Sequence, residues 1–162
     1  KNLTWPFTIL LKKMAKYKTT VTHLEMMPPF PPAAPDVGWP DGHSFARETD
    51  ISVAAYRALY DDVGRQWHWV NRRVLTDRQL SAIIHHPATE IFTLKARDRA
   101  IGFVELNFKL FPQVEIVFVG LVENFIGRGL GATMRVLCCY GCSSFPYTYF
   151  CFRLAQMIIR KS

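Results

Sequence analysis

Acidic residues are missing from the C-terminal part of the sequence: no Asp or Glu follows Glu123, although the chain continues to Ser162. Histidine is missing there too, since the last one is His86. The first absence argues against a dinucleotide-binding fold, which needs an acidic residue for the ribose about 20 positions after its glycine motif. The second absence means that a zinc site in this region would have cysteine ligands only.

Long apolar runs are also lacking. No clean stretch of about 20 apolar residues occurs, and the nearest one, 136–159, contains Pro146 and Arg153. The apolar stretch 3–11 is short for a signal peptide and no convincing cleavage site follows it. We therefore expect no membrane-spanning segment. Because Met14 heads a more ordinary-looking start, we hypothesise that residues 1–13 lie outside the native protein.

The composition that is present fits one globular domain. The chain has 162 residues, of which 49% are hydrophobic and 20% charged. These values are close to globular averages and exclude wholesale disorder. The net charge of +7 suits an anionic partner, but it does not tell nucleic acid from a phosphorylated cofactor or an acidic membrane. Ordinary solubility charge is the simpler interpretation.

All four cysteines lie close together, between Cys138 and Cys151. Cys139 and Cys142 have the spacing of redox or zinc-binding pairs. The four are not arranged as two such pairs, however. We therefore interpret them as free thiols of a cytoplasmic protein and predict no metal site.

The first half of the sequence predicts an extended arm and two helices. Residues 26–42 carry six prolines and are interpreted as a linker or wrapping arm. Residues 51–63 have the apolar spacing of an amphipathic helix, which Asp50 or Thr49 can cap. The segment 76–79 is a capping box at the start of a second helix.

Three strands are predicted next, at 90–96, 100–110 and 114–121. Their short connections predict that they are antiparallel neighbours. A helix is then predicted from about Gly129 to Tyr140.

The last strand leads into a glycine-rich loop. Residues 115–132, EIVFVGLVENFIGRGLGA, place three glycines where the helix begins. A helix start leaves unpaired N–H groups and carries partial positive charge. Gly127, Gly129 and Gly131 lack the side chains that would keep a phosphate away from the backbone. The loop therefore predicts pyrophosphate binding. A simple strand-to-helix turn stays an alternative, whereas a P-loop is excluded because no Gly-Lys-Ser/Thr follows.

Residues 51–132 resemble the GNAT superfamily of acyl-CoA N-acyltransferases, in particular its small bacterial acetyltransferases. The segment 115–132 carries the resemblance, since the family has a glutamate at the start of its fourth strand and then a Q/R-x-x-G-x-G/A loop. The stretch 56–73, YRALYDDVGRQWHWVNRR, is also similar. The Q/R position falls on Ile126, which departs from the family. The resemblance implies an α/β (α+β) fold with a mixed, mostly antiparallel sheet flanked by helices.

Acetyl-CoA is the acyl donor that this resemblance implies. Its pyrophosphate would lie on the N–H groups from Ile126 to Ala132, and its pantetheine arm would pair with the backbone from Val119 to Leu121. An exposed strand edge beside a loop of N–H donors suits such an amide-bearing, phosphorylated molecule. The implied cofactor-binding residues are Val119, Leu121, Ile126, Gly127, Arg128, Gly129, Leu130, Gly131 and Ala132.

Catalytic roles also follow from the resemblance. Glu115 matches the family's general base, and the N–H of Val119 matches its oxyanion donor. A strand glutamate that faces outward beside Lys109 is the alternative for Glu115. The family's acid is a tyrosine, but no tyrosine after residue 133 stands in the expected context.

The wall of the acceptor site in this family falls on Tyr60, Trp67 and Trp69. Their rings could hold an amine by cation–π attraction. Core packing is the other interpretation of these aromatic residues.

Residues 133–162 do not continue the resemblance. We hypothesise a shifted reading frame or a gene end, with a divergent apolar element packed on the sheet as the alternative. Without the family's fifth strand, one wall of the cofactor cleft is missing and a sheet edge stays open. An open edge predicts aggregation or a homodimer.

The sequence thus predicts an N-acetyltransferase core at 46–141. It lies between an N-terminal extension with the arm, 1–45, and an apolar, cysteine-bearing tail, 142–162. The predicted reaction moves an acetyl group from acetyl-CoA to a small-molecule or peptide amine in the cytoplasm, without a membrane or nucleic acid. An inactive, truncated enzyme is left open. The alternatives are a non-catalytic CoA-binding module and a basic protein that interacts with nucleic acid.

Overall fold

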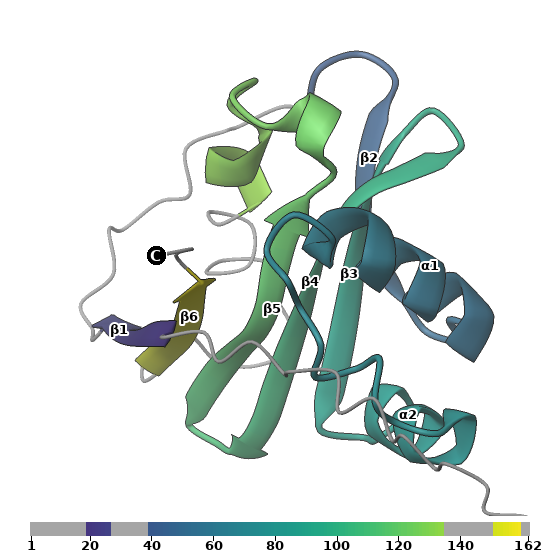
Figure 1. Ribbon diagram of the computed structural model, residues 1–162. Coiled ribbons are helices and arrows are strands. Elements are labelled where there is room, and N and C mark those ends of the chain that lie inside the picture. The colour runs from purple at the N-terminus through teal and green to yellow at the C-terminus, as the bar shows by residue number, and fades with distance from the viewer. Residues whose placement is uncertain (1–18, 27–38, 135–150, 160–162) are drawn as a thin grey trace, which may run out of the picture.

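The protein is built on one six-stranded sheet with the strand order β1-β6-β5-β4-β3-β2. The structure, a computed structural model, describes residues 19–26, 39–134 and 151–159, with side chains for 39–134 (Figure 1). The elements are β1 Thr19–Met26, β2 His43–Glu48, α1 Val53–Gly64, α2 Asp77–Ile84, β3 Thr89–Ala96, β4 Arg99–Leu110, β5 Gln113–Leu121, the 3₁₀ turn η1 Glu123–Phe125, and β6 Cys151–Ile159. Residues 130–134 are helical and follow the glycine loop.

Side-chain caps start both long helices. Ser52 precedes α1, and its hydroxyl accepts a hydrogen bond from the N–H of Ala55 at 3.1 Å. The expected cap at Asp50 or Thr49 was therefore wrong, because α1 begins two residues later than the apolar pattern indicated. The capping box of α2 is confirmed: the Thr76 hydroxyl accepts from the N–H of Gln79, whose side chain accepts from the N–H of Thr76.

The predicted antiparallel meander is confirmed, since β3 pairs with β4 and β4 with β5. Strand β2 was not predicted. It adds to the outer edge of β3, from His43 opposite Ala96 to Glu48 opposite Ile91. The expected start of the core at residue 46 therefore falls inside a continuous strand. Phe45 stacks on Phe92 of β3 with ring centroids 5.5 Å apart, a contact that no local sequence pattern announces.

Strand β6 corrects the expectation that nothing continues the sheet beyond β5. It pairs in parallel with β5 from Gln113 opposite Cys151 to Ile116 opposite Leu154. On its other side it pairs antiparallel with β1 over the whole length of that strand. The N-terminal segment thus covers the far edge of β6 (Figure 1). Sequence patterns could not find this, because the three partners are far apart in the chain.

The sheet separates two hydrophobic clusters. Helices α1 and α2 cover the face that points towards the viewer in Figure 1, where Tyr56, Leu80 and Phe103 are buried. In the second cluster, Leu130 and Met134 of the helical segment pack with β-strand residues such as Leu106. Within the described residues, no helix has the length and apolar character to span a membrane.

Candidate functional site

Strand β5 leaves its neighbour β6 at a β-bulge. Glu105 of β4 lies opposite Phe118, whereas Leu106 lies opposite Ile116, so Val117 is an extra residue in β5. A bulge of this kind bends the strand and increases its twist. The pairing of β5 with β6 ends at Ile116, directly before the bulge. Among the described residues, 117–121 therefore have a strand neighbour only in β4, and their other backbone edge faces the space between the diverging strands.

The glycine loop follows this unpaired edge after η1. Gly127 and Gly129 have φ angles of 81° and 82°, in the left-handed region that favours glycine. A Cβ atom placed on either residue would meet no atom within 4 Å. Glycine is thus required here by the backbone conformation, and the space above the loop is open. As predicted, the helical segment begins directly after Gly129.

The backbone donors of this loop are fewer than the sequence suggested. The N–H of Ile126 donates to the carbonyl of Glu123 at 3.1 Å, and the N–H of Ala132 donates to the carbonyl of Gly129 at 3.1 Å. The two ends of the predicted run are therefore engaged within the chain, by the 3₁₀ turn and by the first helical turn. From Gly127 to Gly131, no N–H group has a partner elsewhere in the described part of the chain.

Packing holds the loop in place from below. Leu130 is buried in the core, while Ile126 and Arg128 are exposed. The guanidinium of Arg128 lies 5.2 Å from the ring centre of Phe125, a cation–π contact that keeps this positive charge beside the open loop. The loop thus offers backbone donors and a cation on one exposed surface.

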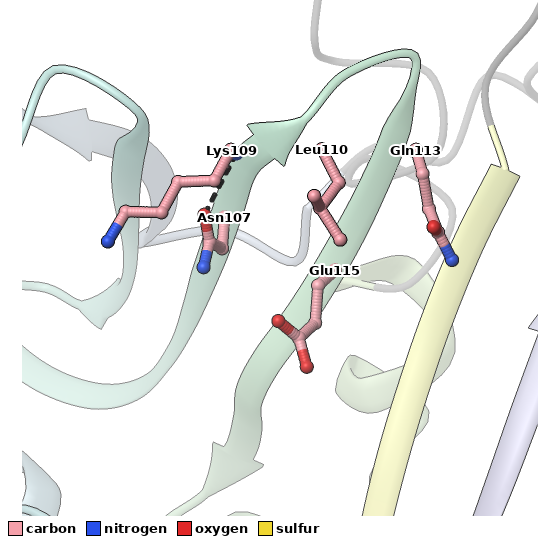
Figure 2. A pocket seen from close by; sticks show the side chains of 5 residues that line it. All are labelled: Asn107, Lys109, Leu110, Gln113 and Glu115. Atoms are coloured by element: carbon pink, nitrogen blue, oxygen red, sulfur yellow. Dashed lines mark hydrogen bonds between the residues drawn. The ribbon is translucent and has the colours of Figure 1, made fainter.

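Glu115 lines an open hollow at the hairpin that joins β4 and β5. The hollow has a volume of about 290 Å³, and Figure 2 shows its lining side chains. They are Asn107, Lys109, Leu110, Gln113 and Glu115. Glu115 is half-buried and lies directly opposite Asn107 in the sheet register. An amine that enters the hollow can therefore come within hydrogen-bond reach of this carboxylate, which a general base requires. The sequence did not single out Asn107 and Gln113, because amides on strands carry no pattern of their own.

The predicted acceptor wall is divided between core and surface. Tyr60 is 1% exposed, and its ring packs edge-on against Phe118 of β5. Trp69 packs on the same Phe118 with ring centroids 4.9 Å apart. Core packing, the alternative that the sequence left open, therefore describes Tyr60 and Trp69. Trp67 is 46% exposed and lies at the surface, whereas Trp69 is partly buried.

A buried ion pair fixes the loop between α1 and α2. Arg72 of this loop donates to the Glu105 carboxylate at 2.5 Å, and the Tyr56 hydroxyl donates to the other carboxylate oxygen. The Glu105 side chain is 2% exposed and that of Arg72 15%. Burial and the neighbouring Glu105 raise the pKa of Tyr56. Burial alone would lower the pKa of Arg72, but Glu105 raises it and the net shift is upward.

Sequence reasoning missed this pair, although one signal was present. Glu105 interrupts the apolar strand AIGFVELNFKL, and a carboxylate in a buried strand needs a cationic partner. The partner itself was not predictable, since Arg72 is one of several arginines in the preceding loop.

No protein-family model and no curated protein matches the sequence. The three-dimensional structure does have similar solved structures. It is similar to a GCN5-related N-acetyltransferase from Sphaerobacter thermophilus, with a TM-score of 0.58, 16% identity, and coverage of 90% of this chain and 44% of that chain. A GCN5-related N-acetyltransferase from Kribbella flavida has a TM-score of 0.56 and 13% identity, with coverage of 85% and 50%.

An aminoglycoside acetyltransferase from an uncultured soil metagenomic sample has a TM-score of 0.53 and 10% identity. In that case the match covers 68% of this chain and 77% of the other. The chain spans about half of the length of the two GCN5-related proteins. The chain therefore shares the α+β fold of these acetyltransferases, which is the fold that the sequence resemblance implied.

Proposed function

We propose that the chain binds acetyl-CoA between the diverging ends of β5 and β6 and transfers its acetyl group to a primary amine. One observation carries the proposal: the edge of β5 that β6 leaves at the Val117 bulge runs directly towards a loop with free N–H donors from Gly127 to Gly131. A strand edge can pair with the amides of a pantetheine arm, and such a loop can hold a pyrophosphate. The GNAT fold of the chain supports the same function.

The residues present fit acetyl-CoA. Gly127 and Gly129 leave open space above the loop, where a side chain would obstruct a phosphate. Arg128 adds a positive charge beside it. The segment 119–121 would hold the arm, with the Val119 N–H as the proposed oxyanion donor. Bound there, acetyl-CoA would supply the activated thioester.

Glu115 is the proposed general base. It would take one proton from the acceptor ammonium, so that the neutral amine can attack the thioester carbonyl carbon. A C–N bond forms, the C–S bond breaks, and the second amine proton ends on the departing sulfur. The products are the acetylated amine and free CoA, with one proton released through Glu115. The group that protonates the sulfur stays unassigned.

Calorimetric titration with acetyl-CoA tests this proposal, with Gly129→Trp as the blocking variant. We expect the variant to lose at least tenfold in affinity, because the indole fills the space above the loop. Gly42→Trp is the matched control: Gly42 has a similar φ of 77° but lies in the turn before β2, so a comparable backbone strain arises far from the loop. Equal affinity in wild type and Gly129→Trp would contradict the proposed site.

The two alternative functions that the sequence left open predict different experimental results. A non-catalytic CoA-binding module would bind acetyl-CoA tightly, but mass spectrometry would detect no acetylated product with any amine. Steeply salt-dependent binding of DNA or RNA that CoA does not compete with would favour a nucleic-acid-interacting protein. The cytoplasmic location and the homodimer stay predictions.

A further inference from the structure

Asn107 and Glu115 face each other across the β4–β5 hairpin. They are partners in the sheet register, and both line the hollow of about 290 Å³. Directly opposite residues of antiparallel strands have Cβ atoms about 5 Å apart and point to the same face of the sheet. Figure 2 shows both side chains on one side of the hairpin, while the Lys109 side chain extends away from Glu115. Asn107 is therefore a polar neighbour of the proposed general base within the hollow.

A backbone hydrogen bond fixes the orientation of the Asn107 amide. The N–H of Lys109 donates to the Oδ1 atom of Asn107 at 3.0 Å (Figure 2). Only the oxygen of a carboxamide accepts hydrogen bonds, and its NH2 group is bonded to the opposite side of the same carbon. The NH2 group of Asn107 is thus left to donate into the hollow that this side chain lines.

Glu115 supplies hydrogen-bond acceptors beside this donor. In the register it also lies opposite Arg153 of β6. A carboxylate has two oxygens with about four acceptor positions, so a cation on the β6 side leaves positions for a ligand in the hollow. The hollow therefore presents donors on β4 directly next to acceptors on β5.

We propose that Asn107 selects an acceptor amine whose neighbouring carbon carries a neutral carbonyl group, as in the N-terminal residue of a peptide. The ammonium lies on Glu115, and the carbonyl oxygen accepts from the Asn107 NH2 group. These two ligand atoms are three bonds apart and therefore at most about 3.6 Å from each other. Side chains at directly opposite positions of paired strands can reach both atoms. The inference rests on the proposed function, in which Glu115 takes the ammonium proton.

A neutral carbonyl suits this position better than the carboxylate of a free amino acid. A carboxylate on the same carbon would lie close to that of Glu115, and like charges at short range repel each other. The rest of a peptide can leave the hollow, because the hollow is open to solvent beside Leu110, which is 72% exposed.

Binding is measured by amide NMR in the absence of acetyl-CoA, with three small probes. Glycinamide has the ammonium and the neutral carbonyl, n-propylamine has a similar size without the carbonyl, and glycine has a carboxylate instead. The resonances of Asn107 and Glu115 are followed. We expect wild type to bind glycinamide about fivefold more tightly than n-propylamine, which is the value of one net hydrogen bond. Glycine should bind more weakly than glycinamide.

Asn107→Asp removes the donor and keeps the shape of the side chain. An aspartate oxygen can still accept from the N–H of Lys109. The added charge attracts the ammonium of glycinamide and of n-propylamine alike, so the ratio of these two affinities is the readout. We expect this ratio to fall to about one or below. Asn71→Asp makes the same chemical change at an exposed residue outside the hollow and should keep the ratio of wild type.

Four results would overturn the proposal. They are that no probe shifts the resonances, that wild type binds glycinamide and n-propylamine equally, that glycine binds more tightly than glycinamide, or that Asn107→Asp keeps the ratio of wild type.

The outcome is independent of the acetyl-CoA titration. If glycinamide is preferred through Asn107 and acetyl-CoA does not bind, the hollow recognises this group but the proposed acetyl transfer fails. If acetyl-CoA binds and wild type shows no preference for glycinamide, the proposed function stands and the inference about its acceptor fails.

Discussion

Arg72 and Arg73 are neighbours in the sequence and both form ion pairs, but their surroundings differ. Arg72 meets the buried Glu105, and its backbone N–H donates to the Tyr60 hydroxyl at 3.3 Å. Arg73 meets Asp61, and both of those side chains are well exposed. A buried pair is costly to break because the remaining charge has no water around it, whereas an exposed pair contributes little.

Replacing each arginine by methionine tests this contrast. We expect Arg72→Met to lower the free energy of unfolding by about 3–5 kcal/mol, because Glu105 stays buried without its cation. Arg73→Met is the matched control and should lower it by less than about 1 kcal/mol. Urea unfolding followed by tryptophan fluorescence measures both. Equal losses would mean that the Glu105 carboxylate is hydrated in solution.

At the scale of the element, one glycine of β5 lets helix α1 approach the sheet. A Cβ atom on Gly120 would lie 2.5 Å from a methyl group of Val63 in α1. Val63 is fully buried, so it has little room to move away. The close approach matters for the proposed site, because Gly120 belongs to the segment of β5 beyond the bulge.

Gly120→Ala is therefore expected to destabilise the protein by about 1–3 kcal/mol, the usual cost of overpacking a core. Gly131→Ala is the control: its Cβ would meet only Leu121, at an ordinary 3.8 Å, and alanine favours the helical segment in which it lies. Thermal unfolding followed by circular dichroism compares the two. If Gly131→Ala were the more damaging substitution, the contact of α1 with β5 would be loose.

At the scale of the whole molecule, the stability of the protein at alkaline pH tests whether tyrosine hydroxyls are buried in the core. Burial raises the pKa of both Tyr56 and Tyr60 above the ordinary value of 10.0. Above about pH 10 an unfolded tyrosine loses its proton, while Tyr56 keeps its proton in the folded state. The unfolded state then binds fewer protons, so the free energy of unfolding falls as the pH rises.

The expected fall that Tyr56 contributes is about 1.4 kcal/mol per pH unit. In Tyr56→Phe the free energy of unfolding should fall less steeply with pH above pH 10, by the amount that one proton contributes. The variant also loses a hydrogen bond and is therefore less stable at neutral pH. Urea unfolding at several pH values between 8 and about 11.5 measures the slope. An unchanged slope would show that the Tyr56 hydroxyl titrates freely in the folded protein.

Local patterns in the sequence determined the elements of the central region. The Thr76 capping box predicted the start of α2, and apolar segments separated by turn residues predicted β3 to β5. Gly127 and Gly129 indicated a glycine-rich loop, and both have positive φ angles. Each of these depends on interactions within a few residues, which any window of the sequence contains.

Only the tertiary structure decided which distant segments meet. It placed β6 beside β5 up to the Val117 bulge, paired Glu105 with Arg72, and put Tyr60 in the core while Trp67 stayed exposed. The physical reason is that pairing between strands and burial of a side chain depend on surfaces supplied by residues far away in the chain. The residues on either side of a glutamate or a tryptophan in the sequence are the same whether its side chain is buried by a distant segment or exposed to water.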